Sequence, residues 1–223
     1  MTFKNLASFA AVAAIALALG NAPASAAKGM WSIGGNFGTG TYSNSDLNDI
    51  LKAQSPPRDE VKSGWEYGGS LRYGVSSKLS IDAELNAIKG SATTTNPSSD
   101  GDEHWRTQGM ALPVNLVYAL SQNESFMFNV FAGAGPMFSA KLHANDNTTD
   151  VESDSKTVFT AQGGFEGQYL ISPKFALDGR VLGRTAKVND IKINGSGATP
   201  PLNLDMSGFG FGLGIRAFFG GGQ

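Results

Sequence analysis

The sequence contains no cysteine, only two histidines and few charged residues, which make up 16% of its 223 positions. The absence of cysteine excludes a disulfide scaffold and any zinc or iron–sulfur site with cysteine ligands. His104 and His143 alone give little support to a histidine-rich metal site or a haem site. A formal net charge of −2 excludes a strongly basic nucleic-acid-binding protein. We therefore expect no cofactor, no bound metal and no nucleic-acid partner.

Glycine and phenylalanine are abundant instead, with 29 and 14 residues. Aromatic side chains pack well on pleated sheet faces, and glycine relieves crowding where strands approach closely. The length is too short for two ordinary domains with a linker, and it is sufficient for one closed core. This composition favours a single β-domain over a helical enzyme.

The first 26 residues have the pattern of a cleaved signal peptide. Lys4 gives a positive start, Ala10 to Leu19 form an apolar stretch, and Ala24-Ser25-Ala26 is a small-residue cleavage site. A membrane-spanning helix is disfavoured because the apolar stretch is shorter than the roughly 20 residues that a bilayer requires. The sequence thus predicts an exported protein of the bacterial envelope, whose mature domain covers residues 27–223.

In the mature chain, large apolar residues recur at every second position, which indicates β-strands. For example, Leu79, Ile81, Ala83 and Leu85 alternate with polar residues. The same period predicts eight strands in all: Gly29–Gly40, Gly64–Val75, Leu79–Ala87, Trp105–Leu120, Phe126–Ala140, Thr157–Ile171, Phe175–Thr185 and Ser207–Phe219.

The connections between these strands alternate in length. Three are short, around Ser76-Ser77-Lys78, Ser121 to Ser125 and Ser172-Pro173-Lys174. Four are expected to be long polar loops: Thr41–Ser63, Gly90–Glu103, Leu142–Lys156 and Ala186–Met206. An even number of strands with short turns at one end and long loops at the other is typical of outer-membrane β-barrels. The predicted fold is an all-β, eight-stranded, antiparallel up-and-down transmembrane barrel with four long extracellular loops.

One face of each strand carries aromatic and aliphatic residues, and the other carries the charges and glycines. A sheet that spans a membrane must close, and its apolar face must meet lipid. A soluble, lipocalin-like barrel with the apolar face inward is the alternative, but it would crowd many aromatics into a small lumen. The membrane orientation predicts two interfacial aromatic belts. The short-turn belt contains Trp31, Tyr73, Tyr118, Phe126, Tyr169, Phe175 and Phe219, and the long-loop belt contains Trp65, Tyr67, Phe138, Phe159 and Phe209.

The charged face predicts a network inside the barrel. Pairing across the short turns places Arg72 opposite Asp82 and Glu166 opposite Arg180. The predicted network contains Glu66, Arg72, Asp82, Glu84, Glu166, Asp178, Arg180, Arg184 and Arg216. Because an eight-stranded barrel has little lumen space, filling of the interior is favoured over a selectivity filter or proton path.

Alternate glycines from Gly208 to Gly214 leave a bare inner stripe on the last strand, next to Gly34 and Gly38 of the first. This stripe lies in a strand and therefore lacks the strand–turn–helix context of a phosphate-binding loop. Room for long arginine side chains is the favoured explanation. A narrow solute path along the seam is the alternative.

Enzymatic activity is not expected. Barrel enzymes that act on lipids need a histidine close to a serine and a carboxylate. His104 and His143 are predicted on neighbouring strands but on opposite faces. The acidic residues Asp150, Glu152 and Asp154 lack the glycine turn and terminal glutamate of a calcium loop, so a solvated loop is favoured. A short amphipathic helix, Asp46 to Ala53, is expected to fold over the barrel mouth.

Several segments resemble the small outer-membrane β-barrel proteins of Gram-negative bacteria, the group that includes the OmpA transmembrane domain, OmpX and OmpW. The resemblance rests on ALPVNLVYAL (Ala111–Leu120), FNVFAGAGPMF (Phe128–Phe138), ISPKFALDGR (Ile171–Arg180) and SGFGFGLGIRAFF (Ser207–Phe219). It implies an integral outer-membrane location, contact with lipid and lipopolysaccharide, and assembly by periplasmic chaperones and the barrel-assembly machinery. Such barrels usually end on an aromatic residue, whereas here Gly220 to Gln223 follow Phe219.

These features predict a non-catalytic structural or surface-interaction protein with a largely filled lumen. The alternative, which the resemblance to OmpW allows, is a narrow channel for small or hydrophobic solutes. The expected loops are acidic, since Gly90 to His104 contains Asp100, Asp102 and Glu103 but no lysine or arginine. Acidic loops favour a protein partner, or contact with lipopolysaccharide through shared divalent cations, and disfavour direct phosphate binding.

Overall fold

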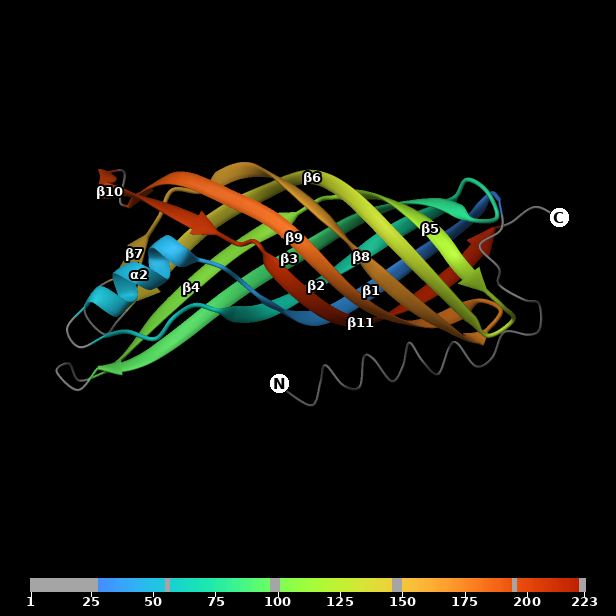
Figure 1. Cartoon of the computed structure of the whole chain (residues 1–223), viewed down its shortest axis with the longest axis horizontal. Coiled ribbons are helices and arrows are strands. Elements are labelled where there is room, and N and C mark those ends of the chain that lie inside the picture. The colour runs from blue at the N-terminus through green and yellow to red at the C-terminus, as the bar shows by residue number, and fades with distance from the viewer. Residues whose placement is uncertain (1–27, 55–56, 97–100, 146–149, 194–195, 221–223) are drawn as a thin grey trace.

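The computed structural model describes residues 28–54, 57–96, 101–145, 150–193 and 196–220. The predicted signal peptide, residues 1–26, and the last three residues lie outside this part of the chain. Within the described residues the chain forms one helix and eleven strands (Figure 1). The helix is α2 (Ser45–Ala53). The strands are β1 (Met30–Thr41), β2 (Ser63–Gly74), β3 (Leu79–Asn96), β4 (Gly101–Ala111), β5 (Val114–Gln122), β6 (Phe126–Asn145), β7 (Asp150–Glu152), β8 (Lys156–Ser172), β9 (Phe175–Ile193), β10 (Ser196–Asp205) and β11 (Gly208–Gly220).

These strands form a closed antiparallel barrel with eight positions around the ring. β4 and β5 share one position, and both pair with β3 and β6. β10 and β11 share another beside β9, while the three-residue strand β7 pairs only with β6. β11 pairs with β1 from Trp31 opposite Phe219 to Gly40 opposite Gly210, which closes the ring. The predicted eight-stranded fold is confirmed.

The three short turns lie at one end of the barrel and are stabilised by side chains that the sequence places in them. The Ser76 hydroxyl accepts hydrogen bonds from the amides of Lys78 and Leu79. The Asn123 carbonyl accepts bonds from the amides of Ser125 and Phe126. Such side-chain to backbone bonds replace ladder hydrogen bonds where the strands end. They fix the register of the three hairpins.

The expected long loops are wrong in three of four cases, because the strands continue through them. β3 extends to Asn96, β6 to Asn145 and β9 to Ile193, with β4, β8 and β10 returning beside them. In the long strands β3, β6 and β9, the polarity of the two faces changes along the strand. In β3 the inward residues change from Asp82 and Glu84 to Ile88, while Lys89 points outward. The apolar face therefore turns inward beyond this level, and a search for outward apolar faces does not detect it.

This reversal divides the barrel into two parts. We call the part between the short turns and the level of Trp65 and Phe159 the turn half, and the part beyond it, which carries α2, the α2 half. In Figure 1 the turn half lies to the right and the α2 half to the left. Both aromatic belts lie on the turn half.

A β-bulge in β6 shifts the side-chain alternation at the boundary between the halves. Ser139 has a left-handed backbone conformation with φ 52°, and the pairing with β4 shifts between Gln108 and Met110. The extra residue reverses the phase of the rest of the strand. As a result Leu142 is buried inside, and His143 lies on the outer side. The prediction that His104 and His143 lie on opposite faces is therefore wrong.

The connection from β1 to β2 folds across the open end of the α2 half. Its helix α2 confirms the amphipathic segment expected there, and Leu47 and Leu51 are buried. Ile50, on the other side of the helix, is 40% exposed. Arg58 in the following segment donates two hydrogen bonds to Glu103 of β4, at 2.6 and 2.7 Å. These contacts tie the connection to the barrel rim.

Candidate functional site

Charged side chains fill the lumen of the turn half. Arg72 of β2 donates to Asp82 of β3 at 2.7 Å and to Glu166 of β8 at 2.8 Å. Arg216 of β11 lies 3.2 Å from Asp178 and 3.5 Å from Asp82. We call the full set the charged layer: Glu66, Arg72, Asp82, Glu84, Glu166, Asp178, Arg180, Arg184 and Arg216. The structure brings all nine predicted lumen residues together.

The register of two hairpins is as predicted, but one ion pair differs. Arg72 is opposite Asp82, and Glu166 is opposite Arg180, in the strand ladders. Glu166 nevertheless binds Arg72 across the lumen, and Arg180 reaches Glu84 of β3 at 3.1 Å. Arg72 also binds Asp82 on the adjacent strand, so arginine side chains here bind both adjacent strands and strands across the bore. The cross-strand pairing rule therefore predicts the register of the strands, but it does not predict every ion-pair partner.

Buried amides complete the charged layer, and the sequence-based prediction omitted them. Gln162 donates to Glu84 at 3.2 Å and accepts from Arg184 at 3.3 Å. Asn129 donates to Glu166 at 3.1 Å, and Asn86 donates to Glu84 at 2.8 Å. A buried carboxylate needs several donors because it has lost its water. These amides occupy the same alternation phase as the charges, so the period of two contained the signal.

The glycine stripe gives space to arginine side chains. A methyl group on Gly34 would lie 3.2 Å from Cζ of Arg216, and one on Gly212 would lie 3.3 Å from Cγ of Arg180. Both distances are tighter than ordinary contacts, so the arginines pack directly against bare backbone. This geometry supports the space-filling interpretation of the stripe.

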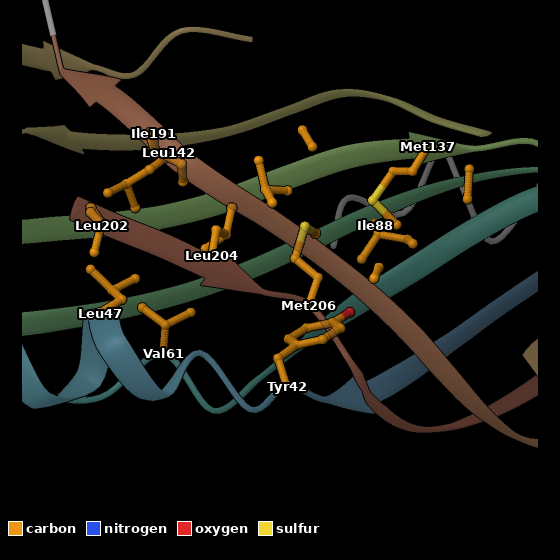
Figure 2. Close-up of a cluster of buried hydrophobic side chains, with 14 of the residues drawn as sticks. Tyr42, Leu47, Val61, Ile88, Met137, Leu142, Ile191, Leu202, Leu204 and Met206 are labelled. Carbon is orange, nitrogen blue, oxygen red and sulfur yellow. The ribbon is translucent and has the colours of Figure 1, made fainter. Parts of the chain in front are cut away.

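The lumen of the α2 half is apolar, which the sequence-based prediction missed. Figure 2 shows side chains from β3, β6, β9, β10 and the β1–β2 connection pointing toward one another. We call this cluster the apolar cap: Tyr42, Leu47, Leu51, Val61, Ile88, Ala111, Met137, Ala140, Leu142, Ala186, Val188, Ile191, Leu202, Leu204 and Met206. Burial raises the pKa of the Tyr42 hydroxyl, which lies 3.5 Å from Glu66 at the top of the charged layer.

A second, smaller apolar cluster closes the short-turn end. Met127, Ala176 and Phe218 are buried there, and Met30 and Leu170 pack against them. We call this cluster the turn plug. The lumen thus consists of a charged layer between two apolar seals.

Cavities inside this stack are small. One of about 20 Å³ lies within the charged layer, beside Glu66, Arg180 and Gly212. Another of about 20 Å³ lies below it, beside Arg72, Asn129 and the turn plug residue Phe218. Each has room for about one water molecule. The turn plug and the charged layer therefore leave little free space between them.

The outer surface of the turn half is apolar. At the short-turn end the rings of Trp31 and Tyr73 lie 4.8 Å apart, and at the other end those of Phe37 and Trp65 lie 5.2 Å apart. Eleven of the twelve residues proposed for the belts are exposed, and Phe175 is half-buried. Tyr73 and Trp65 are eight residues apart on β2. At ~3.3 Å per residue and ~40° tilt this spacing is about 20 Å, close to the apolar band of outer-membrane barrels.

The two histidines do not form a joint site. Nε2 of His143 lies 3.1 Å from Asp150, and Nδ1 of His104 lies 3.0 Å from the Thr93 hydroxyl. Across the described ranges, no group of three or more His, Asp or Glu side chains is arranged to hold a metal ion. In the same ranges no helix is long and apolar enough to cross a membrane.

The family model described as the outer membrane protein beta-barrel domain matches residues 8–218. The chain belongs to this family. The predicted resemblance to small outer-membrane barrels is confirmed, and the outer membrane is the site at which this family resides. No curated protein sequence matches the chain.

Solved structures share the fold at low sequence identity. The outer membrane protein OprG from Pseudomonas aeruginosa is 13% identical with a TM-score of 0.55, over 87% of this chain and 98% of that one. The N-terminal barrel domain of OprF from the same organism is 12% identical, with a TM-score of 0.48 and coverage of 86% and 98%. Ail, the attachment invasion locus protein of Yersinia pestis, is 15% identical, with a TM-score of 0.44 and coverage of 86% and 99%. At such identity the likeness to OprG shows a common fold alone.

Proposed function

We propose that this protein is a sealed, non-catalytic barrel that supports the outer membrane and contacts other molecules through its surface. The observation that carries the proposal is the filled lumen. A solute would have to pass the turn plug, the charged layer and the apolar cap in turn. Opening the charged layer would leave carboxylates without their arginines, which costs several kcal/mol per unpaired buried charge.

Single-channel conductance of the refolded mature barrel, Ala27–Gln223, in a planar bilayer tests this proposal. We expect no steady openings from protein whose insertion is verified by heat-modifiable gel mobility. A matched variant with Leu204→Ser and Met206→Ser hydrates only the apolar cap, and it should also stay silent because the other two layers remain. Reproducible openings of the unmodified barrel would show that the lumen conducts and would overturn the proposal.

A narrow channel is the second candidate. It is favoured by two cavities of about 20 Å³, one within the charged layer at the glycine seam and one between that layer and the turn plug. If they belong to a conducting path, Gly212→Val should reduce its conductance because the added side chain crowds Arg180. Openings that Gly212→Val abolishes would favour the channel over the sealed barrel.

The absence of catalysis is also part of the proposal. Among the described contacts of His143 there is Asp150 but no serine or threonine hydroxyl that could serve as a nucleophile. Ester or peptide hydrolysis by the purified barrel that His143→Ala removes would contradict this point.

Lipid, lipopolysaccharide, periplasmic chaperones and the barrel-assembly machinery are the partners that we assign to such a protein. The exposed apolar band and its aromatic ends support contact with lipid, since tryptophan and tyrosine anchor at membrane interfaces. A protein partner at the acidic rim stays a further prediction. Crosslinking in native membranes would identify either class.

A further inference from the structure

The outward face of β3, β4 and β6 carries a cationic patch at the level of the long-loop belt. The strand ladders place Lys89 opposite Gln108, and Gln108 opposite Lys141, in one row across three strands. The next outward row contains Ser91, Arg106 and His143. Strands lie ~4.8 Å apart and outward rows ~6.6 Å apart, so the three cations share an area of about 10 by 7 Å.

The bulge at Ser139 brings Lys141 into this patch. Phe138 points outward, and Lys141 is three residues later. In a regular strand, residues three positions apart lie on opposite faces, so without the bulge Lys141 would point into the lumen. With it, Lys141 and His143 join the outer side of the barrel, and Leu142 takes the inward position in the apolar cap. The sequence pattern alone assigns these two residues to the wrong face.

The patch has an excess of positive charge. Its three cations lie near two carboxylates. Glu152 pairs with Lys141, whose ammonium lowers the pKa of that carboxyl, and Asp150 lies 3.1 Å from Nε2 of His143. Within the described residues, neither Lys89 nor Arg106 has an ion-pair partner, and Lys89 lies 5.6 Å above the ring of Tyr67. By contrast, Lys52 and Lys62 pair with Glu60, and Lys187 pairs with Asp205.

The height of the patch identifies what it meets. Lys89 is directly opposite Trp65 in the ladder, at the level where aromatic side chains mark the boundary between hydrocarbon and headgroups. Anionic headgroups at that level attract outward lysine and arginine side chains. In outer-membrane barrels the end with the long hairpins, here the α2 half, lies on the side of the outer leaflet. That leaflet contains lipopolysaccharide, which the proposed function already includes as a partner.

We propose that Lys89, Arg106 and Lys141 bind the phosphate groups of lipopolysaccharide directly. This inference rests on the proposed membrane role and replaces the expectation that acidic loops disfavour direct phosphate binding. Among the acidic groups of this sector, Glu152 lies in the row of Arg106, and Asp150 and Asp102 lie in rows farther from the belt. The row nearest the headgroups therefore carries Lys89 and Lys141 without a carboxylate, and the carboxylates begin in the next row.

Binding of the refolded full chain to fluorescent diphosphoryl lipid A in mixed micelles tests the site. We expect the triple variant Lys89→Gln, Arg106→Gln, Lys141→Gln to bind at least tenfold more weakly than the unmodified protein. A control with the same loss of charge, Lys62→Gln, Lys187→Gln, Lys192→Gln, should bind within twofold. Heat-modifiable gel mobility verifies that both variants are folded.

Two further arms decide the chemistry. Binding should persist in EDTA, because the proposed contacts need no bridging cation, and it should weaken severalfold for monophosphoryl lipid A. Loss of binding in EDTA, equal losses in the patch and control variants, or equal affinity for phosphatidylglycerol would overturn the proposal. Conductance measurements are independent of these assays, so failure of the sealed-barrel proposal is distinguishable from failure of this one.

Discussion

The turn half and the α2 half share the long strands β3, β6 and β9, yet the polarity of the inner and outer faces is exchanged between the two halves. In the turn half, Ile81 and Leu85 of β3 face outward and Asp82 and Glu84 face the lumen. A few residues farther along the same strand, Lys89 faces outward and Ile88 is fully buried. β3 itself keeps its regular alternation through this level, without the bulge that β6 has there. What changes is the surroundings of the barrel wall.

This difference shows how a barrel wall responds to its solvent. Where lipid surrounds the wall, apolar side chains are accommodated outside, and the interior is closed by paired charges. Where water surrounds the wall, burial of apolar side chains must come from the interior, at about 25 cal/mol per Å². The chain therefore has two cores of opposite chemistry, and each can be perturbed separately.

The largest effect should come from breaking the charged layer. Arg72→Ala leaves Asp82 and Glu166 buried without their main partner, although Arg216 lies 3.5 Å from Asp82 and retains part of the attraction. We expect the free energy of unfolding to fall by about 3 kcal/mol, the lower end for a broken buried ion pair. Urea unfolding in lipid vesicles, followed by gel mobility, measures it.

The matched control is Arg106→Ala, which removes the same side chain from the outer side of β4. Because Arg106 is exposed, its loss should change stability by no more than about 0.5 kcal/mol. Equal destabilisation by both changes would show that the charged layer contributes nothing specific.

A smaller effect is expected in the apolar cap. Leu51 of α2 is fully buried, so Leu51→Ala should lower the free energy of unfolding by about 2–3 kcal/mol. Ile50→Ala on the exposed side of the same helix is the control and should cost less than about 0.5 kcal/mol. Limited proteolysis of the β1–β2 connection should detect release of α2 only in the first variant.

The Arg58–Glu103 pair tests how the β1–β2 connection is held to the rim. Arg58→Lys keeps the charge but loses the two-pronged geometry of the guanidinium. We expect a small decrease in the midpoint of urea unfolding, since the pair is only partly shielded from water. No change relative to the unmodified barrel would mean that charge alone holds the connection.

The smallest effect should appear with acid. The Lys52 and Lys62 ammonium groups lower the pKa of Glu60 in the same connection. A carboxyl with a lowered pKa stabilises the fold above its unfolded value of about 4.3, and this contribution disappears as the pH falls through the folded value. Pepsin should therefore cut the connection faster as the pH falls below about 4. Glu60→Gln should remove this pH dependence.

Alternation of apolar residues predicted the strand order, the hairpin register and the outward face of the turn half. It could do so because every lipid-facing position in the membrane band must be apolar. Arg72 opposite Asp82 followed from the short turn alone. The charged side chains of the lumen could be named in the same way. Their partners could not, because Arg180 and Glu84 meet across the bore through side-chain length rather than through the ladder.

The α2 half escaped prediction for a different reason. Its apolar residues, such as Val188 and Leu204, face inward and are separated by polar residues and glycine. A search for strands with an outward apolar face therefore assigns these segments to loops. The bulge at Ser139 has no marker in the sequence, and it moved Lys141 and His143 to the other face. A search for inward alternation beyond the belts would have found the extended strands.

The contacts of the charged layer also constrain the order in which the barrel can form. Arg72 and Glu166 are 94 residues apart, Arg180 and Glu84 are 96 apart, and Arg184 and Glu66 are 118 apart. A curved, unclosed sheet cannot hold these groups at bonding distance, so they stay hydrated until β11 reaches β1. Arg72–Asp82 and Arg216–Asp178 can pair between neighbouring strands, but the pairs across the bore have to wait for closure, and a barrel whose last seam is open keeps these charges uncompensated.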